Sequence, residues 1–215
     1  MSDAETTPLS SGGWVSLLLQ IAAQQRPALL GLILLTLITG AAYPAVLLGV
    51  GRLFFPGQAD GSLVFRSGVV VGSRLIGQGF SRPEYFQPRP SAAGSGYDAT
   101  QSSGANLAPA NPKLIEQVRQ AAVAYRKLNG LAAGAPTPID AVTSSGSGLD
   151  PDISPQNAAL QVARVAKARG VGAALVRQLV AENTRGPDLG FIGASRVSVL
   201  SLNLALDRAA PMSAR

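Results

Sequence analysis

The feature of this sequence that most restricts its fold is an uncharged apolar run of 23 residues from Ala28 to Val50. As an α-helix, at about 1.5 Å per residue, the run would be roughly 34 Å long, which is enough to cross a hydrocarbon core of about 30 Å. Arg26 and Arg52 flank it, as snorkelling side chains flank membrane helices. The apolar region of a cleaved signal peptide is usually shorter, about 7–15 residues. The sequence therefore predicts a retained transmembrane anchor over residues 26–51.

The predicted anchor contains small residues and one proline, and both affect how a helix packs. Glycine and alanine allow another membrane helix to approach closely. Proline lacks the N–H that an α-helix needs, so we expect Pro44 to kink the C-terminal third of the anchor. Basic residues on the two sides are too evenly divided to set the orientation by the positive-inside rule. The positions expected to pack against other membrane helices are Gly31, Gly40, Ala41, Ala42 and Pro44.

An N-terminal tail of residues 1–25 precedes the anchor. Its apolar residues Trp14, Leu17, Leu18 and Ile21 recur at helical spacing. This pattern fits a short helix lying in the membrane interface, and a flexible tail fits the sequence equally well.

The composition excludes several kinds of catalytic and metal site. The chain has no cysteine and no histidine, so it cannot form a disulfide, a thiolate zinc site, a cysteine nucleophile or a Ser-His-Asp triad. Neither glycine nor aspartate is ever followed by lysine, which excludes the phosphate-binding GxxxxGK[ST] loop and the Asp-Lys-Thr-Gly motif of P-type ATPases. No lysine follows a serine by three residues, which argues against a Ser/Lys hydrolase. The sequence therefore predicts neither a catalytic nor a metal site.

Residues 52–215 are predicted to form one further domain. Segments 62–65 and 69–76 have β-forming composition and are separated by Arg66-Ser67-Gly68, which predicts a hairpin. Residues 78–111 show little periodicity, but a stretch this long inside a domain is expected to be ordered when its own aromatic side chains can pack.

Helix start and stop signals follow the hairpin. Asn111 and Ser154 each precede a proline, which is typical of helix N-termini, and Gly130 and Gly170 are typical helix ends. Because the expected strands and helices are segregated along the chain, the sequence predicts an α+β domain after a single N-terminal transmembrane helix. The expected helices span residues 112–129, 155–169 and 171–184, and a short strand over 196–199 leads into residues 200–206.

Basic residues outnumber acidic residues by 16 to 10 from Gly57 onward. They are scattered along the sequence, which argues against nucleic-acid binding. Their densest group, Arg164, Lys167, Arg169 and Arg177, is expected to form a solvated helix face. The basic surplus also motivates an alternative function: a stand-alone, membrane-tethered extracytoplasmic module that binds cell-wall or small anionic ligands.

A series of short motifs follows one another along residues 26–207. In the membrane segment they are Arg26-Pro27-Ala28-Leu29, Leu37-Ile38-Thr39-Gly40 and Tyr43-Pro44. In the domain they include Gly72-Ser73-Arg74-Leu75-Ile76-Gly77-Gln78, Arg89-Pro90-Ser91-Ala92, Ser147-Gly148-Leu149-Asp150, Arg164-Val165-Ala166-Lys167-Ala168-Arg169 and Leu202-Asn203-Leu204-Ala205-Leu206-Asp207. No single motif is specific, but together and in this order they resemble the C-subunit family of the Kdp potassium-transporting ATPase.

The resemblance implies a subunit that is not an enzyme by itself, in a complex that imports potassium with high affinity at the expense of ATP. It implies a bacterial inner-membrane protein with one membrane helix and an extracytoplasmic domain over residues 52–215. The implied partners are the potassium-carrying A subunit, the ATP-hydrolysing B subunit, the small F subunit and membrane lipid. No cofactor is implied for this chain, since ATP and Mg²⁺ act through the B subunit and potassium is the transported ion. The resemblance also implies a catalytic chaperone that raises the ATP affinity of the B subunit.

Within the domain we expect a few polar, rigid positions to contact the partner subunits. The alternative for each is an internal hydrogen bond that braces a loop, and the sequence leaves both open. Asp150 and Asp152 do not fit a calcium-binding loop, and an Asx-type turn is the better interpretation of them. The expected contact positions are Gln78, Arg89, Ser91, Asn106, Asp150 and Asn203.

Overall fold

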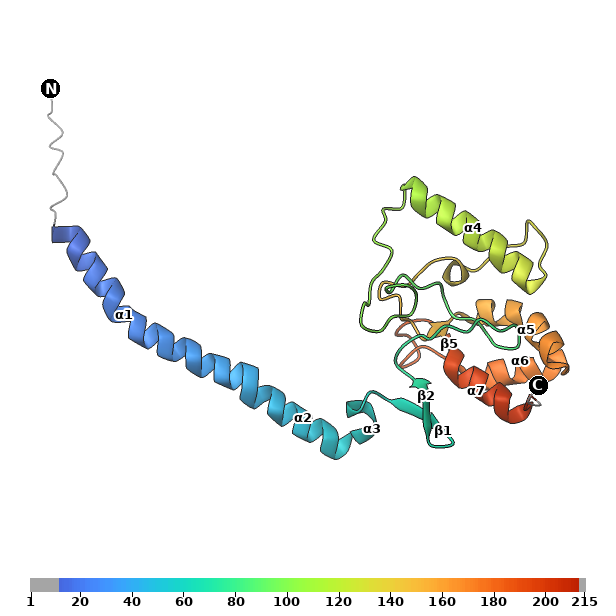
Figure 1. Cartoon of the computed structure of the whole chain (residues 1–215), viewed down its shortest axis with the longest axis horizontal. Helices are drawn as coiled ribbons and strands as arrows, with labels where there is room; N and C mark the ends of the chain where they lie inside the picture. The colour runs from blue at the N-terminus through green and yellow to red at the C-terminus, as the bar shows by residue number, and fades with distance from the viewer. Residues whose placement is uncertain (1–11, 213–215) are drawn as a thin grey trace, which may run out of the picture. The chain divides into compact units, whose positions relative to one another are not determined.

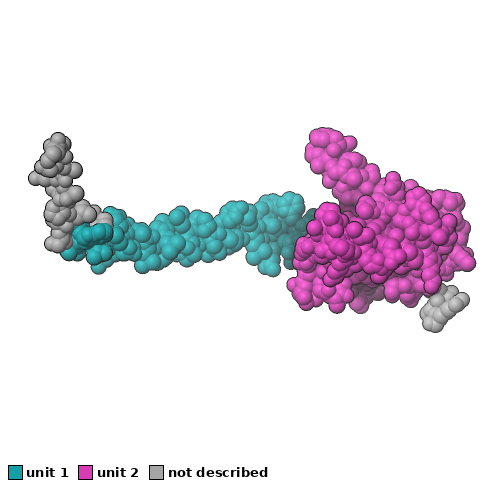
Figure 2. Space-filling model, turned by 90° about the horizontal axis from the view of Figure 1, so that it is seen from above, with its two compact units in different colours: residues 1–60 teal, residues 61–215 magenta. Residues whose placement is uncertain are grey.

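The computed structural model of the chain describes residues 12–212. The chain divides into two compact units between Asp60 and Gly61 (Figure 2). Unit 1 holds the apolar run, and unit 2 holds both sheets and the remaining helices.

Unit 1 is a long helical element followed by one short helix (Figure 1). From Gly13 to Phe54 it is 42 residues long and apolar enough to cross a membrane. The expected anchor, residues 26–51, lies within this helix. Residues 12–25 of the expected tail are helical too, whereas the expectation for residues 1–11 lies outside the described residues. The successive parts are α1 (Gly12–Leu37), the π-helical turn η1 (Ile38–Ala42), α2 (Tyr43–Phe54) and α3 (Pro56–Ala59).

The π-helical turn η1 lies directly before Pro44, where the sequence predicts a kink. A proline in an α-helix cannot donate to the carbonyl four residues earlier, and its ring crowds that carbonyl. In η1 the N–H of Tyr43 donates instead to the carbonyl of Ile38, five residues earlier, so the turn holds one extra residue. Pro27, in contrast, lies inside α1 without such a turn. The proline at position 44 therefore changes the winding of the helix without ending it.

Unit 2 begins with the expected hairpin, β1 (Leu63–Arg66) and β2 (Val69–Ser73), which pair antiparallel. Ser67 and Gly68 both have positive φ, 50° and 78°, as a two-residue turn of type I′ requires. β2 ends at Ser73, before the predicted end at residue 76. The Ser73 hydroxyl explains the early end, because it donates to the carbonyl of Gly61 and accepts the N–H of Leu75, which turns the chain.

Four helices form most of unit 2: α4 (Pro112–Asn129), α5 (Pro155–Arg169), α6 (Ala173–Glu182) and α7 (Val199–Ala209). The predicted start signals are confirmed, since the side chains of Asn111 and Ser154 accept the N–H groups of Lys113 and Asn157. Gly130 and Gly170 end α4 and α5 in the left-handed conformation, with φ of 65° and 67°.

A second, three-stranded sheet was only partly predicted. Its antiparallel order is β3-β5-β4, formed by β3 (Asp152–Ile153), β4 (Thr184–Arg185) and β5 (Arg196–Ser198). β5 matches the predicted strand, whereas β3 and β4 are too short to show alternation in the sequence. Helices α5 and α6 lie between β3 and β4 in the chain, so the expected segregation of strands and helices is wrong. The α+β class holds, because every strand pair is antiparallel.

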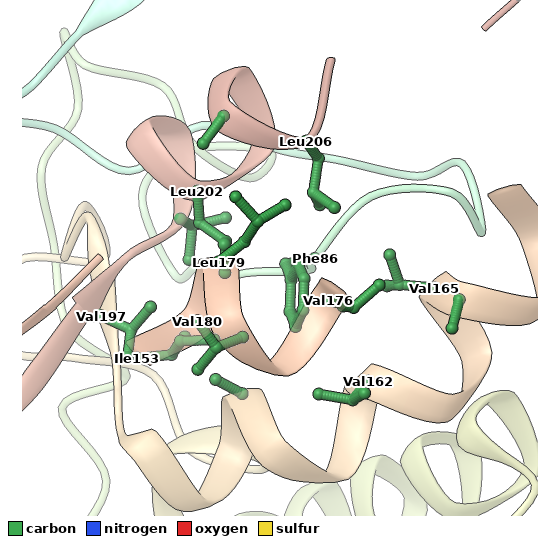
Figure 3. Close-up of a cluster of buried hydrophobic side chains, with 14 residues drawn as sticks. Phe86, Ile153, Val162, Val165, Val176, Leu179, Val180, Val197, Leu202 and Leu206 are labelled. Atoms are coloured by element: carbon green, nitrogen blue, oxygen red, sulfur yellow. The ribbon is translucent and has the colours of Figure 1, made fainter. Parts of the chain in front are cut away.

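The hydrophobic core of unit 2 lies where α5, α6 and α7 meet the three-stranded sheet (Figure 3). Phe86 points into its centre and is fully buried, although it comes from residues 78–111, which contain no helix or strand. We call this segment the long loop. Around the Phe86 ring lie Val162 of α5, Val176 of α6 and Leu206 of α7. The long loop is therefore ordered, as the sequence predicts, and its Phe86 is part of the core.

Candidate functional site

A buried arginine on α5 holds the first part of the long loop. Arg164 is 9% exposed, and its guanidinium donates hydrogen bonds in three directions. Nη1 donates to the carbonyls of Pro83 (2.6 Å) and Tyr85 (2.9 Å), Nη2 to Oε1 of Gln161 (2.6 Å), and Nε to Oδ1 of Asn129 on α4 (2.9 Å). Burial lowers the pKa of Arg164, yet a guanidinium stays protonated in proteins. The positive charge is thus stabilised by oriented carbonyl and amide oxygens.

Two side-chain amides hold the next part of the loop by its backbone. Asn203 of α7 accepts the N–H of Phe86 at 2.8 Å and donates to its carbonyl at 3.0 Å. Gln161 of α5 makes the same pair of bonds with Gln87, at 2.8 and 3.1 Å. Buried backbone groups need such partners. The long loop has no neighbouring strand to bond with, so these two side-chain amides supply the partners of its buried backbone groups.

Asp140 extends the buried polar network toward the N-terminus of α5. Its carboxylate accepts the N–H and hydroxyl of Ser154 and the amide of Asn157, at 2.7, 2.9 and 3.0 Å. The hydroxyl of Tyr125 on α4 donates to Oδ1 of Asn157 at 2.8 Å. Burial and the nearby Asp140 raise the pKa of Tyr125, so its hydroxyl remains a donor across the neutral range. The network therefore joins α4 to α5.

A second charged cluster joins the hairpin to α5 and α7. Asp207 of α7 pairs with Arg169 (2.8 Å) and Arg66 (2.6 Å), and it accepts the hydroxyl of Tyr85 at 3.2 Å. The guanidinium of Arg169 lies 4.9 Å from the centre of the Tyr85 ring. Burial alone would raise the pKa of Asp207, but the hydrogen bonds from Arg169, Arg66 and Tyr85 outweigh it and lower this pKa.

An open cleft of about 720 Å³ lies between α4 and the long loop. Its lining is mostly aromatic, proline and small side chains, with no charged side chain among them. The polar groups in the lining, such as the Tyr125 hydroxyl and the Gln161 amide, bond within the chain. Among residues 12–212, no three Asp, Glu, His or Cys side chains gather closely enough to hold a metal ion.

Three of the expected contact positions brace the loops of unit 2. Arg89 pairs with Asp150 at 2.9 Å, joining the long loop to the segment before β3. Ser91 donates to the carbonyl of Gly148 at 2.7 Å and accepts the N–H of Tyr97 at 2.8 Å. Gly148 has φ of 68°, and a side chain there would lie 2.6 Å from a backbone oxygen. Its backbone therefore approaches the long loop as only glycine allows.

The other expected positions differ in exposure. Asn203 is 2% exposed and bonds within the chain, whereas Asn106 is exposed and bonds weakly with Ser103, at 3.5 Å. Gln78 donates to the carbonyl of Val71 at 3.1 Å. Asp150 also accepts the N–H of Asp152 at 3.0 Å, which confirms the expected Asx turn. Internal bracing is thus present at five of the six positions, Asn106 being the exception, and the contact of all six with partner subunits stays a prediction.

The small residues of the membrane helix are grouped around the π-helical turn. Gly40, Ala41 and Ala42 belong to η1, Pro44 follows in α2, and all four are exposed. Gly31 lies earlier, in α1, where an added Cβ would meet nothing within 4 Å. The structure thus leaves room for another helix at these positions, and their packing in a complex stays a prediction.

The buried polar residues of α5 do not stand out in the sequence. The prediction that Arg164 and Arg169 lie on a solvated face is wrong: Arg164 is buried, and the Arg169 side chain has 0% exposure. Asn157, Gln161 and Arg164 are spaced by four and three residues, as one helix face requires. That spacing is the signal in the sequence. Because a polar helix face is normally solvated, the spacing alone does not distinguish a buried polar face from a solvated one.

Comparisons with known proteins identify the family. The family model described as "KdpC: K+-transporting ATPase, c chain" matches residues 25–208. A protein of Beijerinckia indica named "Potassium-transporting ATPase KdpC subunit" is 56% identical over 187 residues, covering 87% of this chain and 94% of its own length. Proteins with the same name from Mycobacterium tuberculosis H37Rv and Caulobacter vibrioides are each 54% identical, covering 86% of this chain and 98% and 93% of their own. The chain therefore belongs to the KdpC family, the c chain of the K⁺-transporting ATPase.

Proposed function

We propose that the chain is a non-catalytic subunit that assembles and stabilises an ATP-driven, high-affinity potassium import complex in the bacterial inner membrane. The observation that carries the proposal is the membrane helix. None of the residues in its most apolar stretch is buried by the rest of the chain, so the surface of the helix is available to lipid and to other membrane helices. Because the chain belongs to the KdpC family, we expect those other membrane helices to belong to the K⁺-transporting ATPase complex.

The π-helical turn supports a packing role for this helix. Pro44 cannot donate to the carbonyl of Gly40, and membrane proteins often pair such freed carbonyls through neighbouring helices. The turn also presents Gly40, Ala41 and Ala42, whose small side chains permit close approach. We therefore place the contact with the other membrane subunits around η1.

Unit 2 is proposed to be extracytoplasmic and to lie near the potassium entrance of the A subunit. Its braced loops form a rigid surface, which suits a part that positions or supports another subunit. The A, B and F subunits are the proposed partners, with ATP and Mg²⁺ bound by the B subunit. The proposed rise in the ATP affinity of the B subunit would act by conformational coupling through the membrane helix, because this chain has no phosphate-binding loop.

The test is recovery of the complex through a tag on the C-terminus of this chain. Membranes from potassium-starved cells are solubilised in mild detergent, and the co-purifying proteins are identified. We expect a P-type ATPase and a large potassium-channel-like protein, with potassium-stimulated ATP hydrolysis. Recovery of the chain alone, from cells that express those partners, would overturn the proposal and favour the stand-alone binding module.

Matched variants separate assembly from folding. Gly40→Leu should reduce recovery of the partners, because it fills the π-helical turn. Gly49→Leu is the matched control, since it places the same bulk in α2, outside the expected contact positions.

A second test concerns Arg89 in unit 2. Arg89→Ala and Asp150→Ala each remove the ion pair between these two residues. A contact role for Arg89 requires that Arg89→Ala lowers recovery of the partners below that of wild type while unit 2 stays folded. Wild-type recovery with unchanged potassium uptake would leave Arg89 with its bracing role alone.

A further inference from the structure

The β1–β2 hairpin has two different faces. Toward α7, Arg66 pairs with Asp207, and Arg66 and Val71 line a small cavity with Asp207. Side chains alternate along a strand, so Phe65, next to Arg66, lies on the opposite face. The pairing register shifts between Val64 and Phe65, and beyond this bulge Leu63 pairs with the buried Ser73. Phe65 pairs across the strands with Val70, which places both on that same face.

We call Phe65 and Val70 the apolar hairpin face. They are 61% and 48% exposed, so the described part of the chain leaves about half of each residue uncovered. A two-stranded hairpin is marginally stable in water by itself and normally packs on something. Val69, which pairs with Arg66 beside the turn, is 65% exposed as well, so the end of the hairpin next to the turn is apolar and open.

The position of the hairpin in the chain limits what can cover this face. Leu63 follows the last residue of the membrane helix, Phe54, by nine residues. At about 3.5 Å per extended residue, the hairpin starts within roughly 30 Å of the helix end, whatever the orientation of the two units. Phe54 and Phe55, at the end of the helix, are also exposed. Exposed apolar and aromatic residues therefore occur both at the end of the membrane helix and in the hairpin that follows it in the chain.

The charge around this segment complements a bilayer surface with anionic lipid. Between residues 52 and 74 the charged residues are Arg52, Asp60, Arg66 and Arg74, an excess of positive charge. Arg52 and Arg74 are exposed at the two ends of the segment. Arginines beside exposed aromatic residues are typical of surfaces that rest in the headgroup region of anionic membranes.

We propose that the apolar hairpin face rests on the lipid bilayer in which the chain is anchored. Phe65 and Val70 enter the boundary between headgroups and acyl chains, while Arg52 and Arg74 contact the phosphates of anionic phospholipid. The ion pair between Arg66 and Asp207 then links this membrane contact to α7. The hairpin thus serves as a second, peripheral membrane attachment that restricts the motion of unit 2 relative to the bilayer.

The chain has no cysteine, so a single introduced cysteine can report on this face. We would label Val70→Cys with an environment-sensitive fluorophore in the full chain, reconstituted in phosphatidylcholine–phosphatidylglycerol vesicles that contain a lipid-borne quencher. The matched control is Val123→Cys on α4, which is 58% exposed and equally conservative. We expect a blue shift and strong quenching at position 70, little of either at position 123, and weaker quenching at position 70 in pure phosphatidylcholine. Adding Phe65→Ser should reduce the quenching at position 70.

Other outcomes would overturn the proposal. Equal quenching at positions 70 and 123 would show that the hairpin does not contact lipid. Equal quenching in both vesicle compositions would contradict the role of anionic phospholipid. If position 70 is shielded from water but not quenched from the bilayer once the other subunits are co-reconstituted, a protein surface covers this face. Both substituted valines are exposed, so loss of folding does not confuse these outcomes.

Discussion

Asn203 shows how much of the long loop depends on a single side chain. Its amide pairs with both backbone groups of Phe86, the residue at the centre of the core. Asn203→Ala would leave a buried N–H and a buried carbonyl without partners, and each such group costs about 1–3 kcal/mol. We expect a loss of about 3 kcal/mol in the free energy of unfolding, measured by thermal unfolding followed by circular dichroism.

Gln178 of α6 provides the control for this substitution. It is exposed and bonds only with Glu182 one turn later. Gln178→Ala should change the free energy of unfolding by less than about 0.5 kcal/mol. A similar loss for both variants would show that the bonds to Phe86 do not stabilise the domain.

Asp207 makes the stability of unit 2 depend on pH. Burial opposes ionisation of Asp207, but the hydrogen bonds from Arg169, Arg66 and Tyr85 hold its pKa in the folded protein below the usual 3.8. The unfolded chain therefore binds a proton at a higher pH than the folded chain does. The stabilisation is fully present above the unfolded pKa, and it is lost as the pH falls below about 4 and through the folded pKa.

The variant Asp207→Asn tests this dependence. It should unfold at a lower temperature than wild type at neutral pH, and the difference between the two should shrink as the pH is lowered from about 5 to about 2. Asp188→Asn is the control, because the Asp188 side chain is 69% exposed. If the difference between wild type and Asp207→Asn stays constant with pH, the carboxylate charge is not the source of the stabilisation.

At the scale of elements, two prolines in one helix have different consequences. α1 passes through Pro27 without change, whereas Pro44 follows a π-helical turn. Pro44→Ala restores a backbone N–H that can bond to the carbonyl of Gly40, so we expect η1 to become regular α-helix. When the turn rewinds from five residues per hydrogen-bonded turn to four, every side chain after it would rotate about the helix axis relative to α1.

This change can be followed in two ways. Backbone carbonyl chemical shifts of residues 38–42 should move to ordinary α-helical values in Pro44→Ala, and recovery of partner subunits through the tagged chain should fall. Pro27→Ala should leave both unchanged. Unchanged shifts in Pro44→Ala would mean that Thr39, whose hydroxyl donates to the carbonyl of Leu35 at 2.7 Å, or other residues maintain the turn.

At the scale of the whole molecule, the two units depend on different surroundings. All 14 residues of the buried hydrophobic cluster belong to unit 2, whereas the membrane helix leaves its apolar side chains exposed. We expect residues 61–215, produced alone, to fold with a cooperative thermal transition and to fail to recover the partner subunits. A fragment that does not unfold cooperatively would show that the core needs the membrane helix. A fragment that recovers the partners would show that unit 2, without the membrane helix, holds the contact needed for assembly.

The sequence by itself determined the elements whose causes are local. Asn111, Ser154, Gly130 and Gly170 act on neighbouring backbone groups, so helix ends could be predicted from them. The helix that is long and apolar enough to cross a membrane could be predicted because its length and composition need no other part of the chain to explain them.

Only the tertiary structure decided which polar residues are buried and what they hold. Arg164 bonds to residues about 80 positions away in the sequence, so no local pattern distinguishes it from a solvated arginine. β3 and β4 exist because each pairs with β5, and two residues cannot form a strand alone. The same holds for the expected contact position Asn203, whose partner Phe86 lies on another segment. Contacts between distant segments depend on how the chain folds in space, and that information is spread over the whole sequence.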